Sequence, residues 1–406
     1  MEERICLQPE YVSRFQCDGT ACNAKCCKGW KITIDSKTYQ KYCNLEPVSF
    51  RKRVISKMKY QKGQNQFAIR LDNKGRCPFL GKDLLCEIQK NYGAEYLSKT
   101  CQVYPRIIND FGDMMQKSLT LTCPVAAELV LLQEDPIAFE QVRTTPEDFP
   151  RKWPEKIWSY AFDVQYGGIS ILQNRKLSID QRLVVLGFFL DQANDMVAAG
   201  KTDQLKELSA VYASDDFMEN VPEMLQAIPF RPKEYFRTMF VLLEELYGTK
   251  SEFFRQEQWA LRDVKRAYRL PNEAVSINLA DAQEVYQTHI SKIRVKLVEE
   301  FSHILENFLV NEFFMNVYPF RIQGNFVLNY EVFLLIYKLS EFIFCSSASF
   351  RPLPKEEIVS FFVIFSKRLE HNVKYMQEFA RAVHKQDQDI VNIMRVLLDV
   401  APGDFA

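Results

Sequence analysis

The chain of 406 residues is long enough for two or three domains, and its apolar fraction of 47% is ordinary for a protein with a hydrophobic core. Lys and Arg balance Asp and Glu, 52 against 52, which argues against a protein whose whole surface binds a polyanion. The charge is nevertheless divided, because residues 1–130 carry an excess of Lys and Arg and residues 131–406 an excess of Asp and Glu.

The sequence predicts neither export nor a membrane span. Its charged start, Met1 to Arg4, lacks the apolar run of a secretory signal, and no stretch approaches about eighteen uncharged apolar residues. We therefore expect a cytoplasmic protein without a transmembrane span. The sequence is compatible with peripheral membrane association, and it leaves the oligomeric state open. In a reducing compartment structural disulfides are disfavoured, so clustered cysteines there favour metal ligation.

The first 135 residues are predicted to form a small α+β domain. Asp35 is suited to cap a short helix, and a basic helix follows Pro47. Apolar alternation and turn residues predict a strand at 67–71 and a hairpin over 103–121. Pro124 is placed to open a further helix, since proline is favoured in the first helical turn.

The remainder of the chain is predicted to be mostly helical. Residues 136–155 are rich in proline and charge and are predicted to be a linker. Beyond them apolar residues recur every three to four positions, most clearly from Ile290 to Phe308. The predicted fold class is α+β: a cysteine-rich α+β metal- or iron–sulfur-binding domain (1–135), the linker, and a mostly α-helical domain (156–406).

Eight of the eleven cysteines form an ordered array in the first 130 residues. Four of them fall within eleven residues in the spacing C-x4-C-x3-C-C. All four histidines lie in the predicted helical domain, so a site in the first domain must use thiolates, carboxylates or backbone groups. A centre held by four thiolates, either zinc or an iron–sulfur cluster, is favoured. Eight thiolates exceed one tetrahedral site, so two centres, or one centre with additional thiols, are both open. Buried inert thiols are the alternative. The candidate metal ligands are Cys17, Cys22, Cys26, Cys27, Cys77, Cys86, Cys101 and Cys123.

Several familiar signatures are missing from the sequence. The radical S-adenosylmethionine spacing C-x3-C-x2-C begins at Cys22 and Cys26 but meets Gly29 where its third cysteine belongs. Walker, G-x-G-x-G and Ser/His/Asp patterns are also missing. The basic run at 51–59 lacks interleaved aromatic residues, so we interpret it as a solvated helix face and expect no nucleic-acid partner.

From Phe15 to Trp30 the chain resembles the flagellin lysine-N-methylase family, whose cysteine cluster is of the zinc- or iron-chelating kind. The likeness continues in order through segments around the later cysteines and near the C-terminus. These segments are Cys77-Pro78-Phe79-Leu80, Cys86, Leu97-Ser98-Lys99-Thr100-Cys101, Tyr104-Pro105-Arg106, Leu121-Thr122-Cys123-Pro124, Glu306-Asn307-Phe308-Leu309-Val310-Asn311 and Tyr318-Pro319-Phe320.

The resemblance implies S-adenosylmethionine-dependent methyl transfer to lysine ε-amines, with flagellin as the protein substrate. It further implies a 4Fe–4S cluster held by the N-terminal cysteines, for which zinc is the alternative. Asn307 and Asn311 lie four residues apart in a family-like segment and so share a helix face. Because buried amides need partners, they are candidates for binding the cofactor. The catalytic residues are unknown from the sequence.

Two other classes of function compete with the methyltransferase. One is a non-enzymatic metal-binding or electron-transfer protein with a helical interaction domain. The other is an interaction scaffold whose metal is purely structural. Turnover of labelled cofactor with flagellin would separate the enzyme from both.

Overall fold

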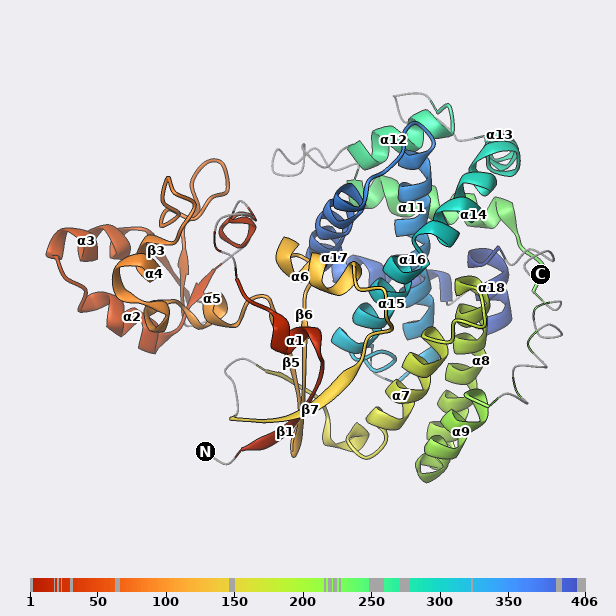
Figure 1. Ribbon diagram of the computed structural model, residues 1–406, viewed down its shortest axis with the longest axis horizontal. Helices are drawn as coiled ribbons and strands as arrows, with labels where there is room; N and C mark the ends of the chain where they lie inside the picture. The colour runs from red at the N-terminus through yellow and green to blue at the C-terminus, as the bar shows by residue number, and fades with distance from the viewer. Residues whose placement is uncertain are drawn as a thin grey trace. The chain divides into compact units, whose positions relative to one another are not determined.

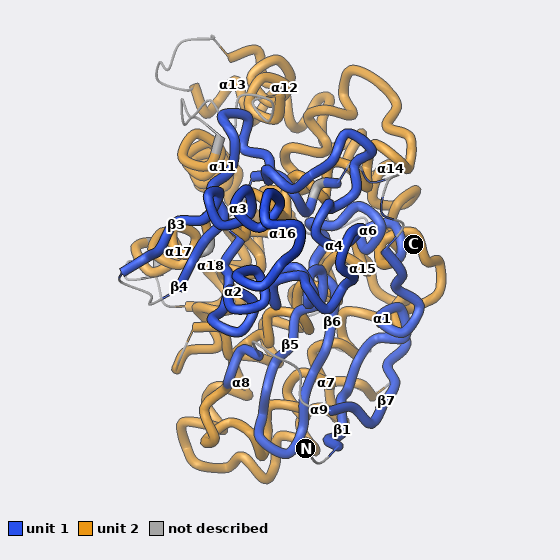
Figure 2. The backbone as a smooth tube through the Cα atoms, turned by 90° about the vertical axis from the view of Figure 1, so that its left-hand side faces the viewer, with its two compact units in different colours: residues 1–129, 138–152 blue, residues 130–137, 153–406 orange. Residues whose placement is uncertain are grey.

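The structure is a computed structural model, and it describes most of the chain in two compact units. Unit 1 comprises residues 1–129 and 138–152, and unit 2 comprises residues 130–137 and 153–406 (Figure 2). The described residues are 3–17, 19, 22, 24–29, 32–62, 66–145, 150–214, 217, 221, 225, 228–247, 259–270, 278–322, 324–384 and 389–399.

Unit 1 contains a mixed five-stranded sheet in the order β7-β1-β6-β5-β8 (Figure 1). The central strand β6 (Met114–Leu119) pairs antiparallel with β5 (Arg106–Phe111) and parallel with β1 (Arg4–Pro9). β7 (Phe139–Thr144) lies antiparallel to β1, and β8 (Arg151–Lys152) lies parallel to β5. The hairpin predicted over 103–121 is confirmed, because β5 and β6 follow each other in the chain and pair antiparallel from Arg106 opposite Leu119 to Phe111 opposite Met114.

The expected linker is wrong in one part, because residues 139–144 form β7. This strand pairs with β1 along its whole length, from Phe139 opposite Pro9 to Thr144 opposite Arg4. The Glu140 carboxylate also accepts a hydrogen bond from Gln8 Nε2 at 2.9 Å. The prolines that suggested a linker lie before and after the strand, so they bound it without removing a ladder donor.

A second, antiparallel sheet in the order β2-β4-β3 and several short helices complete unit 1. Asp35 caps its first helix as predicted, since its carboxylate accepts from the Thr38 N–H at 2.9 Å. Ile34, Tyr42 and Phe79 are buried in the local apolar core. The elements are α1 (Tyr11–Arg14), β2 (Thr33–Ile34), α2 (Ser36–Cys43), α3 (Val48–Ser56), β3 (Met58–Gln61), β4 (Gln66–Ile69), α4 (Glu87–Tyr92), the 3-10 turn η3 (Ala94–Tyr96), α5 (Lys99–Val103) and α6 (Pro124–Leu131), which continues into unit 2.

Unit 2 is helical and is built around α16 (Phe326–Ala348). Residues Phe326 to Ser347 of this helix are all buried, and it packs against α8, α11, α12, α14, α17 and α18. No described helix combines the length and the apolar character needed to cross a membrane. The other elements are η4 (Glu155–Ile157), α7 (Ala161–Leu172), α8 (Ile179–Ala198), η5 (Thr202–Gln204), α9 (Leu205–Tyr212), α11 (Pro232–Tyr247), α12 (Trp259–Ala267), α13 (Leu279–Val285), α14 (Ser291–Glu300), α15 (Ser302–Met315), α17 (Lys355–His384) and α18 (Ile390–Leu397).

The apolar periodicity from Ile290 to Phe308 runs across a break. A π-helical turn (Tyr286–Ile290) leads into α14, and α15 begins after Phe301, whose backbone leaves the helical region at φ −118° and ψ 23°. The same apolar spacing therefore covers two helices, because periodicity reports burial and does not report backbone continuity. The α+β class itself is confirmed.

Candidate functional site

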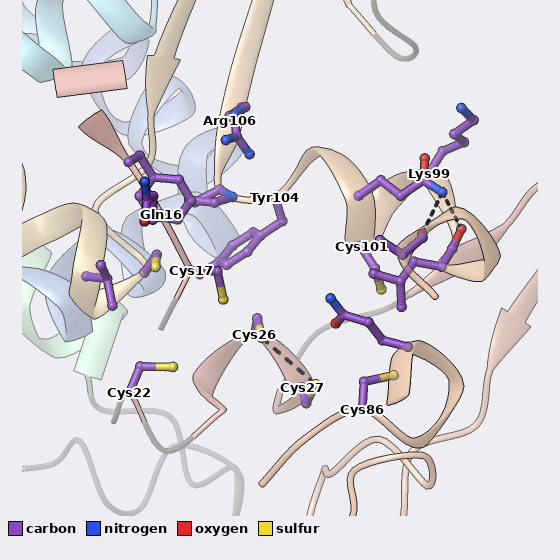
Figure 3. A pocket seen from close by; sticks show the side chains of 18 of the residues that line it. Gln16, Cys17, Cys22, Cys26, Cys27, Cys86, Lys99, Cys101, Tyr104 and Arg106 are labelled. Carbon is purple, nitrogen blue, oxygen red and sulfur yellow. Dashed lines mark hydrogen bonds between the residues drawn. The ribbon is translucent and has the colours of Figure 1, made fainter. Parts of the chain in front are cut away.

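A cavity of about 770 Å³ in unit 1, called here the cysteine pocket, gathers most of the predicted ligands. Besides the cysteines, its lining residues are Phe15, Gln16, Lys41, Gln89, Ala94, Glu95, Leu97, Lys99, Gln102, Tyr104, Pro105, Arg106, Pro124 and Val125. Figure 3 shows cysteine side chains from separate segments around this cavity. The cysteines that line it are Cys17, Cys22, Cys26, Cys27, Cys86, Cys101 and Cys123.

Local backbone features position these thiols. Cys26 and Cys27 lie on the 3-10 turn η1 (Lys25–Cys27), and Gly29 follows with a positive φ of 82°, which glycine adopts without strain. The Cys77 N–H donates to the Cys27 carbonyl at 2.8 Å, which holds the buried Cys77 next to the turn. Cys86 occupies the position before α4. The sequence Cys26-Cys27-Lys28-Gly29 thus forms a compact turn.

Cys101 is held in a similar way on α5. Its N–H donates to the side chain of Ser98, the cap of that helix, at 3.3 Å. Ser98 is buried, so its hydroxyl fixes the helix start. Cys101 consequently faces the pocket from the segment that follows Cys86 in the chain.

Five thiols form what we call the larger thiol group: Cys26, Cys27, Cys77, Cys86 and Cys101. The Sγ atoms of Cys26 and Cys27 lie 3.9 Å apart. This hydrogen bond lowers the pKa of Cys26 to about 7, whereas the pKa of Cys27 is raised by the same bond and by burial. Burial, with the charges of neighbouring thiols, raises the pKa of Cys77 to about 12 and that of Cys101 to about 11.

Three further thiols form the smaller thiol group: Cys17, Cys22 and Cys123. Burial, together with the charges of Cys22 and Cys17, raises the pKa of Cys123 to about 11. Among the charges that shift these pKa values, the five thiols act on one another, and Cys17 and Cys22 act on Cys123. This division bears on the choice between one centre and two, which the sequence leaves open.

The donor chemistry of the pocket suits a soft or iron-rich cation. Burial raises the pKa of five of the eight thiols, and a bound cation removes that penalty by neutralising the thiolates. In the described part of the chain, no three His, Cys, Asp or Glu side chains stand close enough around one point to hold a single metal ion. The residues thus fit such a centre in type and number, while their side chains as placed do not form a closed coordination shell.

The pocket also carries polar groups to which the sequence analysis assigned no role. Lys41, Lys99 and Arg106 line it together with a single carboxylate, that of Glu95. The Tyr104 hydroxyl lies 3.1 Å from Thr122 Oγ1. Two of these residues lie in the Tyr104-Pro105-Arg106 segment, and its nearness to Cys101 in the chain is the signal that could have found them.

Asn307 and Asn311, the candidate cofactor-binding residues, are buried in α15 and do not line the cysteine pocket. Asn307 Nδ2 donates to the Gln133 carbonyl at 2.8 Å and to the Leu131 carbonyl at 3.4 Å. Its amide therefore ties α15 to the segment that follows α6 in unit 2. The cysteines outside the predicted array, Cys6, Cys43 and Cys345, are likewise not lining residues.

A family model and several known proteins resemble this chain. Residues 168–397 match a family model described as the FliB lysine N-methylase C-terminal domain. Proteins named Lysine-N-methylase from Salmonella typhimurium and Salmonella choleraesuis are each 28% identical over 260 residues, which cover 59% of this chain and 63% of theirs. The flagellar biosynthetic protein FliU of Salmonella muenchen is 35% identical over 147 residues, 36% of this chain and 87% of that protein. No solved structure matches.

Proposed function

Since the chain belongs to the FliB lysine N-methylase family, we propose that it is a protein-lysine methyltransferase that methylates ε-amines of flagellin. The names of the relatives support the lysine methylase activity and the flagellar context. The chain spans 63% of the length of the two lysine-N-methylases that it matches, so the activity of the whole relatives is carried over as part of this proposal.

The methyl donor of the proposal is S-adenosylmethionine. A lysine ε-amine has an ordinary pKa of about 10.4, so it must first lose a proton. In direct transfer the amine lone pair forms the N–C bond while the C–S bond breaks. The sulfonium sulfur keeps that electron pair and leaves as a neutral thioether, and the nitrogen then loses a proton. A site that desolvates the amine favours the neutral form.

A thiolate-held centre in the cysteine pocket is the second part of the proposal. The larger thiol group supplies more than the four thiolates that a 4Fe–4S cluster or a zinc ion requires. Such a centre, when bound, would supply redox chemistry, or it would link the chain segments that carry its cysteine ligands. The observation that carries this part is the convergence of seven predicted ligands on one cavity.

The metal part is tested by iron, sulfide and zinc analysis of protein purified without oxygen. Replacement of both Cys26 and Cys27 by Ala is expected to abolish the metal content, because it removes two members of the larger thiol group. Cys345→Ala is the matched control, since this thiol is buried in α16 of unit 2. Full metal content in the double variant would overturn the assignment.

The activity is tested by incubating the anaerobic protein with labelled S-adenosylmethionine and flagellin. Label incorporated into lysine, and identified by mass spectrometry of flagellin peptides, supports the methyltransferase. A metal-replete protein that incorporates no label would instead favour the non-enzymatic metal-binding or electron-transfer function.

A further inference from the structure

We propose that the guanidinium of Arg106 binds the carboxylate of the methionine part of S-adenosylmethionine inside the cysteine pocket. The inference rests on the proposed function and adds a location and a recognition group for the cofactor. It also places the cofactor's amino-acid end in unit 1, whereas the sequence pointed to Asn307 and Asn311.

The first observation is that Arg106 has no acidic partner among the residues that the structure describes. Its guanidinium carbon lies 5.2 Å from the centroid of the buried Phe15 ring. The ring supports one face of the guanidinium and leaves its in-plane donors available. Arg106 is half-buried, so these donors are partly removed from water.

Three other shielded arginines pair with carboxylates. Arg182 pairs with Glu306 at 2.7 Å, and Arg294 pairs with Asp180 and Glu341. Partly buried Arg4 is paired with Asp110. An arginine that lines a cavity without such a carboxylate is a candidate to receive one from a ligand.

The second observation is the charge of the pocket wall. Its cations are Lys41, Lys99 and Arg106, and its single carboxylate belongs to Glu95. The Lys41 ammonium already donates to the Glu95 carbonyl oxygen at 2.7 Å. Apart from the thiols, the charged side chains of the wall are thus three cations and one carboxylate. The planar fork of Arg106 matches a carboxylate in two parallel hydrogen bonds.

The third observation is the setting of Arg106. It is the first residue of β5 and pairs through its backbone with Leu119 of β6, so the sheet fixes its origin. Figure 3 draws Gln16, Tyr104 and Arg106 above Cys22, Cys26, Cys27 and Cys86. A pocket of about 770 Å³ has the size of a small-molecule site. A ligand held by Arg106 would thus share the cavity with the thiols.

The carboxylate could also come from an acidic side chain of the protein substrate, and the test separates the two sources. Isothermal calorimetry on the full-length, metal-replete chain uses S-adenosylhomocysteine and its decarboxylated analogue, which differ only in the carboxylate. Wild-type protein is expected to bind S-adenosylhomocysteine about tenfold to a hundredfold more tightly than the analogue. The Arg106→Gln variant is expected to lose affinity for S-adenosylhomocysteine and to keep its affinity for the decarboxylated analogue, so the preference should disappear. The Arg106→Lys variant should retain part of the preference.

Arg51→Gln is the matched control, because Arg51 lies on α3 outside the pocket and pairs with Glu46. An undiminished preference for the carboxylate in Arg106→Gln would overturn the inference. The inference would also be overturned if Arg106→Gln left the affinities for both nucleosides unchanged and raised the KM for flagellin, because the carboxylate would then belong to the protein substrate. A wild-type protein that binds neither nucleoside would instead refute the cofactor assignment of the proposed function.

Discussion

At the scale of single residues, Cys26 is distinguished from its neighbours by its acidity. Its pKa is lowered to about 7 because the Cys27 thiol donates a hydrogen bond to it, whereas burial raises the pKa of Cys101 to about 11. In reduced, metal-free protein we therefore expect iodoacetamide to alkylate Cys26 with a half-maximal rate near pH 7. Cys101 should react slowly until the pH is far higher, since the thiolate is the reactive form.

Peptide mass spectrometry over a pH series measures both profiles in one sample. Cys27→Ala serves as the control, because removing the S–H donor should return the pKa of Cys26 toward its ordinary value. The same pH profile for Cys26 and Cys101 in wild-type protein would contradict this account.

Asn307 provides a second prediction at this scale. Replacing Asn307 with Ala leaves the carbonyls of Leu131 and Gln133 without the amide donor of this buried side chain. We expect the free energy of unfolding to fall by about 1–3 kcal/mol, measured by urea denaturation.

The cofactor-binding role of Asn307 and Asn311 stays a prediction. Unchanged affinity of both Ala variants for S-adenosylhomocysteine in folded protein would remove this helix from the cofactor site.

At the scale of elements, a buried ionic network joins α8, α14 and α16. Lys338 Nζ lies 2.6 Å from Glu341 and 3.0 Å from Asp180, and Arg294 pairs with both acids. Burial raises the pKa of Glu341, but the charges of Arg294 and Lys338 outweigh it and bring the pKa to about 2. The network thus places two cations and two carboxylates inside the apolar face of a central helix.

Glu341→Gln is expected to reduce the free energy of unfolding by about 3–5 kcal/mol, because it leaves buried cations short of a counter-charge. Glu357→Gln is the matched control. Glu357 pairs with Arg351 on the surface, with side chains 46% and 54% exposed, so its loss should cost less than about 1 kcal/mol. Equal effects of the two changes would contradict the network's role.

The same network has a pH signature. The folded-state pKa of Glu341, about 2, lies below its usual value of 4.5. Its contribution to stability is therefore fully present above pH 4.5 and is lost as the pH falls toward 2. The difference between wild-type protein and Glu341→Gln should shrink over that window in urea titrations at successive pH values.

At the scale of the whole molecule, the two units should respond differently to loss of metal. If the larger thiol group holds a centre, its removal by an anaerobic chelator withdraws a ligand that stabilises the folded state by mass action. Hydrogen exchange is expected to speed up at the amides of residues 24–29 and 86–103. The amides of α16 should keep their protection, because that helix is buried in its own core.

The readout is mass spectrometry of proteolytic peptides before and after chelation, followed by restoration of the metal. Recovery of protection on restoration separates metal loss from damage. Equal acceleration in both units, or in neither, would contradict a local centre in unit 1.

The sequence by itself was sufficient for features with a local physical cause. Asp35 is a helix cap, and Pro124 opens a helix, because caps and first turns are chosen by neighbouring backbone donors. Apolar periodicity was enough to predict the helical unit. The ordered cysteines, with every histidine elsewhere, singled out the thiols that line one pocket.

Only the tertiary structure decided the features that depend on partners distant in the chain. Residues 139–144 form a strand because they pair with the edge of β1. Nothing in the sequence of this segment identifies β1 as its partner. The division of the thiols into five and three, and the lack of an acidic partner for Arg106 among the described residues, are likewise results of packing. Lys338 and Glu341 lie three residues apart on the apolar helix α16, and Asp180 and Arg294 from other helices make them part of a buried network. Burial and charge pairing are long-range properties, so local sequence patterns indicate which residues matter and the fold decides what each one meets.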